Sequence, residues 1–231
     1  MKYVQWVLWF VSLPLQVALL NSLFRGGFKS FPVLLPYSLI LFLSTVANIA
    51  AREGGYLPAA WQKAYWVVEL IQNWLLYVLI LSLVSRAMRQ SRHRAKTVRW
   101  LILAIGLLWL AALCLTQGPR LNQRMTDFGK YVAFGGALLN LFLWGVLVGT
   151  RHPDRNVLMI SGGYGVQSAG EAIMHSLRML ATPSRSYPMV IAGNVIGSLT
   201  HTLCLAIWWR AVARENAQRV ARPLTGVSSE E

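Results

Sequence analysis

Long apolar runs separated by short polar stretches make up most of the chain. Seven runs are long enough to cross ~30 Å of hydrocarbon as helices, which takes about 20 residues each. They lie at 3–24, 31–51, 62–85, 98–116, 128–150, 156–178 and 189–211. The sixth is the least hydrophobic. The pattern predicts an all-α, multi-pass membrane bundle of seven transmembrane helices, with a polar tail at 212–231.

Both ends of this pattern need interpretation. The first run is longer than the apolar region of a signal peptide and has no small-x-small cleavage site before Arg25, so we expect it to be retained as a span. The first half of the tail, VARENAQRVAR, has two open interpretations. It is either a surface helix attracted to anionic lipid or a solvated extension of the last span.

Composition and charge agree with a membrane protein, and the charges also predict its orientation. The 231 residues are 55% apolar and 13% charged, whereas about a quarter of a soluble domain is charged. The net charge of +14 would suit nucleic acid, but the basic residues lie at the ends of the apolar runs, as the positive-inside rule requires. We therefore expect the lipid bilayer, and not nucleic acid, as the partner.

The same charges predict the orientation. With the N-terminus outside, eight Lys and Arg lie on the outer side and fourteen on the inner side. The inner excess comes mainly from the stretch 86–99, RAMRQSRHRAKTVR, which holds six. The sequence thus predicts an N-out, C-in protein of the cytoplasmic (inner) membrane.

One polar stripe lies inside an apolar run, in the stretch GGYGVQSAGEAIMHS at 162–176. Gln167, Glu171 and His175 follow one another at intervals of four, so they share one side of a helix. Small residues surround them. Such a thin, polar helix is expected to be packed inside the bundle, with its carboxylate and imidazole pointing inward.

Other polar residues are expected at a similar depth. At 1.5 Å per residue, Glu69 and Glu171 both lie about 10 Å below the outer boundary, and His175 about 5 Å below it. Ionisable residues inside a membrane are rare and often functional. The depths predict an outward-opening polar pocket. Its expected ligand-binding residues are Glu69, Gln72, Gln167, Glu171, His175 and Asn194.

The alternative is that these side chains only hold helices together through hydrogen bonds. Pairs of small residues four positions apart also predict close helix packing; they are Gly145 with Gly149 and Gly193 with Gly197. No catalytic residue is predicted.

Cofactor and metal sites find little support. His175 and His201 are offset by ~13 Å in depth, which argues against one zinc centre and against a bis-histidine haem. A retinal Schiff base needs a lysine in the last helix, and MVIAGNVIGSLTHTLCLAIWWRA has none. Cys114 and Cys204 lie within apolar runs and are interpreted as small hydrophobes. We expect neither a metal nor a cofactor.

Two segments in the first third of the chain carry a family resemblance. FPVLLPYSLILFLS begins with Phe31–Pro32, and KAYWVVELIQNWLLYVLILSLVSRAM contains Tyr65, Trp66 and Glu69 in the pattern Tyr-Trp-x-x-Glu. Together they resemble a family of uncharacterised bacterial seven-helix integral membrane proteins. The resemblance implies the seven-span topology and includes Glu69 in the shared pattern, but it implies no activity.

Three hypotheses for function follow. The first is a non-enzymatic membrane protein that senses a ligand or pH through the outer pocket and signals to another membrane protein, most simply through the loop 86–99. The second is a structural or assembly subunit of a larger membrane complex. The third is a small transporter or a membrane-embedded enzyme.

Overall fold

The computed structural model describes residues 2–53, 58–89, 91–116, 121–149, 154–184 and 187–221. These residues form seven α-helices and one short 3-10 helix. In chain order they are α1 (Lys2–Phe24), η1 (Gly27–Lys29), α2 (Leu34–Glu53), α3 (Pro58–Ala87), α4 (Arg94–Leu115), α5 (Leu121–Val148), α6 (Arg155–Ser184) and α7 (Tyr187–Ala221).

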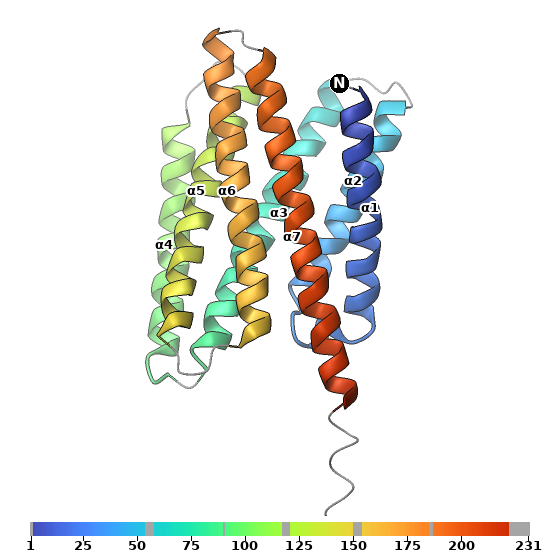
Figure 1. Ribbon diagram of the computed structural model, residues 1–231. Coiled ribbons are helices and arrows are strands. Elements are labelled where there is room, and N and C mark those ends of the chain that lie inside the picture. The colour runs from blue at the N-terminus through green and yellow to red at the C-terminus, as the bar shows by residue number, and fades with distance from the viewer. Residues whose placement is uncertain are drawn as a thin grey trace, which may run out of the picture.

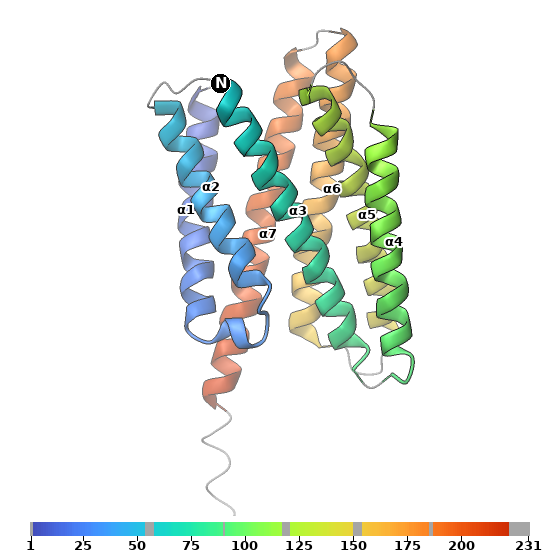
Figure 2. The ribbon, with the colours of Figure 1, turned by 180° about the vertical axis from the view of Figure 1, so that it is seen from behind.

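The helices run alternately up and down along one long axis (Figures 1 and 2). The starts of α1, α3, α5 and α7 lie at one end together with the ends of α2, α4 and α6. We call this the upper end, as it is drawn in Figure 1, and the opposite end the lower end. The C-terminal part of α7 extends beyond the other helices at the lower end.

Five of the described helices are long and apolar enough to cross a membrane. Their apolar spans are Leu34–Ala51, Lys63–Ala87, Arg94–Leu115, Gln123–Val148 and Pro188–Arg219. The apolar helix Phe10–Phe24 is shorter, and α6 does not reach the same hydropathy because its middle is built from glycine, serine and polar residues. The composition therefore indicates a multi-pass membrane protein.

Several helices are longer than their apolar runs. α6 continues to Ser184 and α7 to Ala221, so the first half of the tail is a direct extension of the last helix. Hydropathy marks only the part of a helix that suits lipid, whereas backbone hydrogen bonding continues through polar residues. The extension also packs on the bundle, since Ala211 and Val212 are fully buried.

The larger apolar core of the described residues occupies the lower half of the bundle, and a smaller cluster of Tyr77, Ala112, Phe128 and Val132 joins α3, α4 and α5. The largest side chain of the larger core is Trp208 of α7, which is fully buried. The indole N–H donates to the backbone carbonyl of Ile160 on α6 at 2.8 Å, and the ring meets Tyr37 of α2 edge-on at 5.5 Å between centroids. Trp208 thus joins three helices. The same core contains Leu19, Leu23, Leu79, Ile80, Leu83, Leu143, Leu147, Val157 and Leu205.

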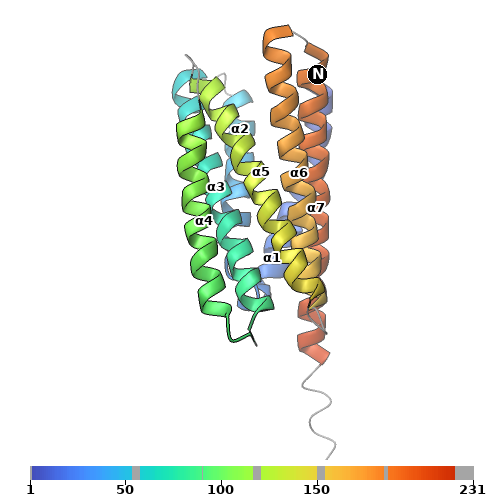
Figure 3. The same ribbon diagram turned by 90° about the vertical axis from the view of Figure 1, so that its left-hand side faces the viewer.

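The upper half is packed less closely. In the described segments there, 42–51 of α2 and 63–75 of α3 contain no buried residue, and 188–203 of α7 contain only Gly193. Figure 3 shows α5 diverging from α6 and α7 toward the upper end. The polar stripe of α6 therefore passes from a dense apolar core into a region where the side chains of its neighbours are partly accessible.

Candidate functional site

Glu69 of α3 and His175 of α6 meet in the upper half of the bundle. The Glu69 Oε1 and His175 Nε2 atoms are 3.9 Å apart. The His175 side chain is only 3% exposed, whereas that of Glu69 is 21% exposed. The pair thus has a closed side at the imidazole and a more accessible side at the carboxylate.

Gln167 extends this cluster toward the middle of the bundle. Its Nε2 donates to the Glu171 Oε1 at 2.9 Å and to the Tyr37 hydroxyl at 3.1 Å. The first bond follows from the spacing of four residues on one helix face. The second ties α6 to α2. Gln167 therefore fixes the Glu171 carboxylate on one side and anchors the stripe to the core on the other.

The Glu69 carboxylate of α3 lies within electrostatic reach of charged groups on α6. Glu171 and Arg178 both act on the Glu69 carboxylate, and the Tyr65 hydroxyl on the same helix is hydrogen-bonded to it. Arg178 also acts on His175, one turn away along α6. Two acids, one imidazole and one guanidinium therefore share a small volume.

Three buried polar atoms of this cluster have no hydrogen-bond partner among the described residues. They are the Glu69 Oε2, the Gln167 Oε1 and the His175 Nδ1. Buried polar atoms are nearly always paired, because leaving one unpaired costs about 1–3 kcal/mol. The polar stripe of α6 and the Glu69 carboxylate therefore retain hydrogen-bonding capacity beyond their internal contacts, as do five buried atoms elsewhere in the described residues.

A glycine on α5 makes room for the imidazole. A Cβ atom on Gly129 would lie 2.9 Å from the His175 Cε1, which is closer than real Cβ contacts. The backbone of α5 therefore lies directly against the ring. His175 is held between α3 and α5, and its position depends on the absence of a side chain at residue 129.

Two of the expected pocket residues make other contacts. Gln72 Nε2 donates to the Ser44 hydroxyl at 3.1 Å, joining α3 to α2. The Asn194 Oδ1 accepts from the Arg178 Nη2 at 2.7 Å and Nε at 3.1 Å, joining α7 to α6. Both lie beside the carboxylate cluster and brace its helices.

The sequence pattern did not point to Arg178, Tyr37 or Tyr65 as members of this site. Arg178 was expected at the end of the sixth span, but α6 continues to Ser184. The available signal was its spacing, since Arg178 follows His175 by three residues on the same helix face. In the sequence the two tyrosines do not differ from other aromatic residues of membrane helices. In the fold, Tyr37 is bonded to Gln167 and Tyr65 to Glu69.

The predicted packing glycines lie in two different environments. A Cβ on Gly193 would meet the Met174 carbonyl oxygen at 3.2 Å, and one on Gly197 would meet the Met174 Sδ at 2.6 Å. These two glycines lie where α7 packs on α6. At Gly145 a Cβ would meet no other described heavy atom within 4 Å, and at Gly149 it would meet only carbonyls of α5 itself.

The described residues contain no group of three His, Cys, Asp or Glu side chains placed to hold a metal ion. Cys114 is exposed and Cys204 is buried, and both are free thiols. The chemistry available at the upper cluster is therefore that of two carboxylates, an imidazole, an amide and a guanidinium.

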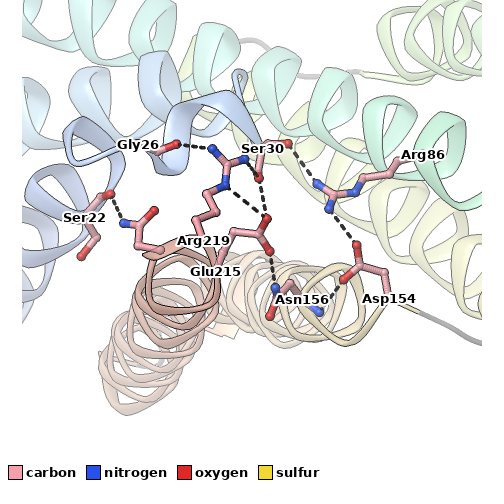
Figure 4. A network of polar contacts seen from close by, with 9 residues as sticks. Ser22, Gly26, Ser30, Arg86, Asp154, Asn156, Glu215 and Arg219 are labelled. Carbon is pink, nitrogen blue, oxygen red and sulfur yellow. Dashed lines mark hydrogen bonds and ion pairs between the residues drawn. The ribbon is translucent and has the colours of Figure 1, made fainter. Parts of the chain in front are cut away.

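A second polar network closes the lower end, and the sequence pattern did not suggest it (Figure 4). Arg86 of α3 forms an ion pair with Asp154 at 2.7 Å and donates to the Ser30 carbonyl at 3.2 Å. Its guanidinium also lies 5.0 Å from the centre of the Phe31 ring. Arg86 thereby connects α3 with the segment before α2 and with the start of α6.

Glu215, in the extension of α7, is the centre of the same network. Its carboxylate accepts from the Ser30 hydroxyl at 2.8 Å and from the Asn156 amide, and it pairs with Arg219 at 3.6 Å. Arg219 also donates to Ser30 and to the Gly26 carbonyl. Glu215 and Arg219 lie beyond the run 189–211 that the sequence predicts as the last span. Their contacts hold this polar end of α7 against the connection between α1 and α2 and against the start of α6.

No family model, no curated protein and no solved structure matches this chain. The functional assignment therefore depends on the geometry of the chain itself.

Proposed function

We propose that the protein is a seven-span sensor of the bacterial inner membrane whose upper cluster binds a small cationic ligand or responds to pH. The observation that carries this proposal is the approach of Glu69 to His175 at 3.9 Å in a cluster where three buried polar atoms have no hydrogen-bond partner among the described residues. Two carboxylates and an amide oxygen are acceptors, so the complementary ligand is a donor of hydrogen bonds, such as an organic ammonium ion.

The topology supports access to this cluster from outside. α1 and α6 run alongside α7 through the bundle (Figure 1), so we count them as spans with the other five. The excess of Lys and Arg at the lower end supports an orientation with that end in the cytoplasm and the upper end outside. The partly accessible half of the bundle consequently faces the exterior, as an outward-opening pocket requires.

The lower network supports a sensor that is closed toward the cytoplasm. Arg86, Glu215 and Arg219 tie α3, the start of α6 and α7 to the connection between α1 and α2 at that end (Figure 4). A ligand that changes the distance between α3 and α6 at Glu69 and His175 would act on helices that are tethered below. The basic stretch 86–99, expected as a loop from the sequence, runs from the last turn of α3 into the first turns of α4, and it is the part through which a partner would detect such a change.

Binding of small ammonium ions to the purified protein tests the proposal. Ethylammonium and tetramethylammonium, added separately, are expected to raise the unfolding temperature of the protein in detergent, because a ligand that binds only the folded state stabilises it. Glu69→Gln is expected to abolish the shift. Asp127→Asn is the matched control, because it removes one carboxylate near the same end that pairs with Lys130 at 3.7 Å instead of joining the cluster.

The outcomes separate the three hypotheses. A shift that is lost in Glu69→Gln and kept in Asp127→Asn supports ligand binding. If no cation shifts the unfolding temperature and the protein copurifies with other membrane subunits, the assembly role is favoured and the sensor is rejected. Ligand-dependent uptake into proteoliposomes would instead support a transporter.

A further inference from the structure

A second site lies at the start of α4, at the lower end of the bundle. An open depression of about 650 Å³ is lined there by Arg92, Lys96 and Arg99 on its polar side and by Trp100 and Leu103 on its apolar side. Lys96, Arg99, Trp100 and Leu103 are spaced three, four and seven residues along the helix, so they share one face. The depression thus passes from positive charge to apolar surface along a single helix.

The three cations of this depression lack an acidic partner within the described parts of the chain. All three side chains are exposed, and the sequence contains no Asp or Glu between Glu69 and Asp127. Arg94, by contrast, is engaged, because it donates to the Ser85 hydroxyl at 2.6 and 3.0 Å and so fixes the start of α4 against α3. The depression is therefore anchored to the bundle while its own charges remain available.

The placement of these charges is unfavourable without an anion. The first turn of α4 contains no acidic residue, and positive charge near a helix N-terminus is repelled by the helix dipole. A bound anion would be attracted both by these cations and by the helix dipole.

The surface that continues from the depression fits an acyl chain. Trp100 is 63% exposed, and Leu103, Leu107 and Leu110 follow it along the same face with exposures of 57%, 66% and 59%. Tryptophan at this level is typical of the boundary between headgroups and hydrocarbon. At 1.5 Å per residue, Lys96 and Leu103 are separated by about 10 Å along the helix, which spans from a phosphate to the upper part of an acyl chain.

We infer that the start of α4 is a binding site for an anionic phospholipid, whose phosphate is held by Arg92, Lys96 and Arg99 and whose acyl chain lies along Trp100 and Leu103. A lipid occupant satisfies both halves of the surface at once, because the cations complement its headgroup and the leucine stripe complements its tail. The site is independent of the upper cluster, since it lies at the opposite end of the bundle.

Quenching of Trp100 by brominated lipid tests this assignment. The protein is reconstituted in phosphatidylcholine vesicles that contain a minor fraction of phosphatidylglycerol, and one of the two lipids carries bromine on its acyl chains. The difference between the wild-type protein and Trp100→Phe isolates the signal of Trp100. Bromine on phosphatidylglycerol is expected to quench this signal at a much lower mole fraction than bromine on phosphatidylcholine.

Two triple variants decide whether the depression is responsible. Replacing Arg92, Lys96 and Arg99 by Gln is expected to weaken the preference for phosphatidylglycerol by at least about tenfold, since each cation near an anionic surface contributes roughly a factor of five. Replacing Arg25, Arg210 and Arg214 by Gln removes the same charge from other exposed positions at the lower end and is expected to leave it unchanged.

Three results would overturn the inference: equal quenching of wild-type Trp100 by both lipids, an unchanged preference in the first triple variant, or an equal loss in the second. If the first triple variant does not fold, Lys96→Gln alone is expected to show an intermediate loss of preference, and an unchanged preference in this variant contradicts the site.

Discussion

The Glu69 carboxylate of α3 and the His175 imidazole of α6 lie 3.9 Å apart in the upper half of the bundle. They form a contact between two helices that otherwise touch each other little, because α3 packs mainly on α2 and α5. The distance between α3 and α6 in the upper half therefore depends strongly on the contact between these two side chains.

The first prediction concerns the coupling between them. In a double-mutant cycle, Glu69→Gln and His175→Gln are expected to be non-additive by about 0.5–2 kcal/mol, the range found for polar contacts between membrane helices. Unfolding in mixed micelles measures each free energy. As a control, Glu69→Gln is combined with Asn140→Ala, which removes a bond to Ser161 at 2.8 Å in another part of the bundle. Additivity in both cycles would mean that the Glu69–His175 contact carries no energy.

The second prediction concerns Gly129. Replacing it by Val forces the His175 ring out of its position, because even a Cβ would lie 2.9 Å from the Cε1. Overpacking of this kind costs about 1–3 kcal/mol, and the ammonium-dependent stabilisation is expected to disappear as well. Gly145→Val is the matched control on the same helix, where a Cβ meets no described atom within 4 Å. Equal effects of the two variants on stability and on binding would contradict the role of Gly129.

The sequence predicted the helices but only some of the side-chain contacts between them. The apolar runs predicted seven helices, and all seven are present, although only five of the described helices are apolar and long enough to cross a membrane. The spacing of Gln167, Glu171 and His175 predicted that they share one face of α6. Depth estimates brought Glu69 to the same level. Depth estimates did not separate Gln72 and Asn194, which bind other side chains, from the residues that form the cluster. Depth alone does not show which side of a helix faces which neighbour. The bond from Gln72 to Ser44 and that from Arg178 to Asn194 depend on helix rotation.

The lower network could not be predicted from the sequence, for a different reason. Arg86, Asp154 and Glu215 stand at the ends of apolar runs, where polar residues are expected in any membrane protein. Only the fold shows that residues from four separate helix ends converge there. The continuation of α7 to Ala221 likewise depends on the contacts of Glu215, which a local pattern does not contain.

The third prediction concerns this network. Glu215→Ala is expected to destabilise the protein by about 1.5–3 kcal/mol, because it removes hydrogen bonds to a charged, largely buried group and leaves Ser30, Asn156 and Arg219 without their shared acceptor. Asp154→Asn is expected to have a smaller effect, within about 1 kcal/mol, since its pair with Arg86 is one-third exposed or more on both sides. Asn is chosen because Asp154 also accepts from the backbone N–H of Asn156 at 2.9 Å at the start of α6, and Asn preserves such a helix cap. Unfolding in mixed micelles compares the two. A larger effect of Asp154→Asn would show that the pair with Arg86, and not Glu215, is the centre of the network.

The fourth prediction concerns orientation. On a background without cysteine, Gln123→Cys at the upper end is expected to react with a membrane-impermeant maleimide in intact cells. Ser91→Cys at the lower end is expected to react only after the membrane is permeabilised. Both side chains are exposed, so differences in burial do not affect the comparison. The reverse labelling pattern would invert the topology and place the upper cluster on the cytoplasmic side.

The most direct test of an outward-opening, acidic pocket is the reactivity of a single cysteine inside it. Ala172 directly follows Glu171 on α6 and is partly exposed, so Ala172→Cys in a protein lacking Cys114 and Cys204 provides a probe at the edge of the cluster. The account predicts that thiosulfonate reagents added outside intact cells modify this cysteine, and that a trimethylammonium reagent reacts about tenfold faster than a sulfonate of similar size because the carboxylates attract cations. Glu69→Gln with Glu171→Gln is expected to remove that preference. A cysteine that neither reagent reaches from outside would show a dry helix contact and contradict the pocket.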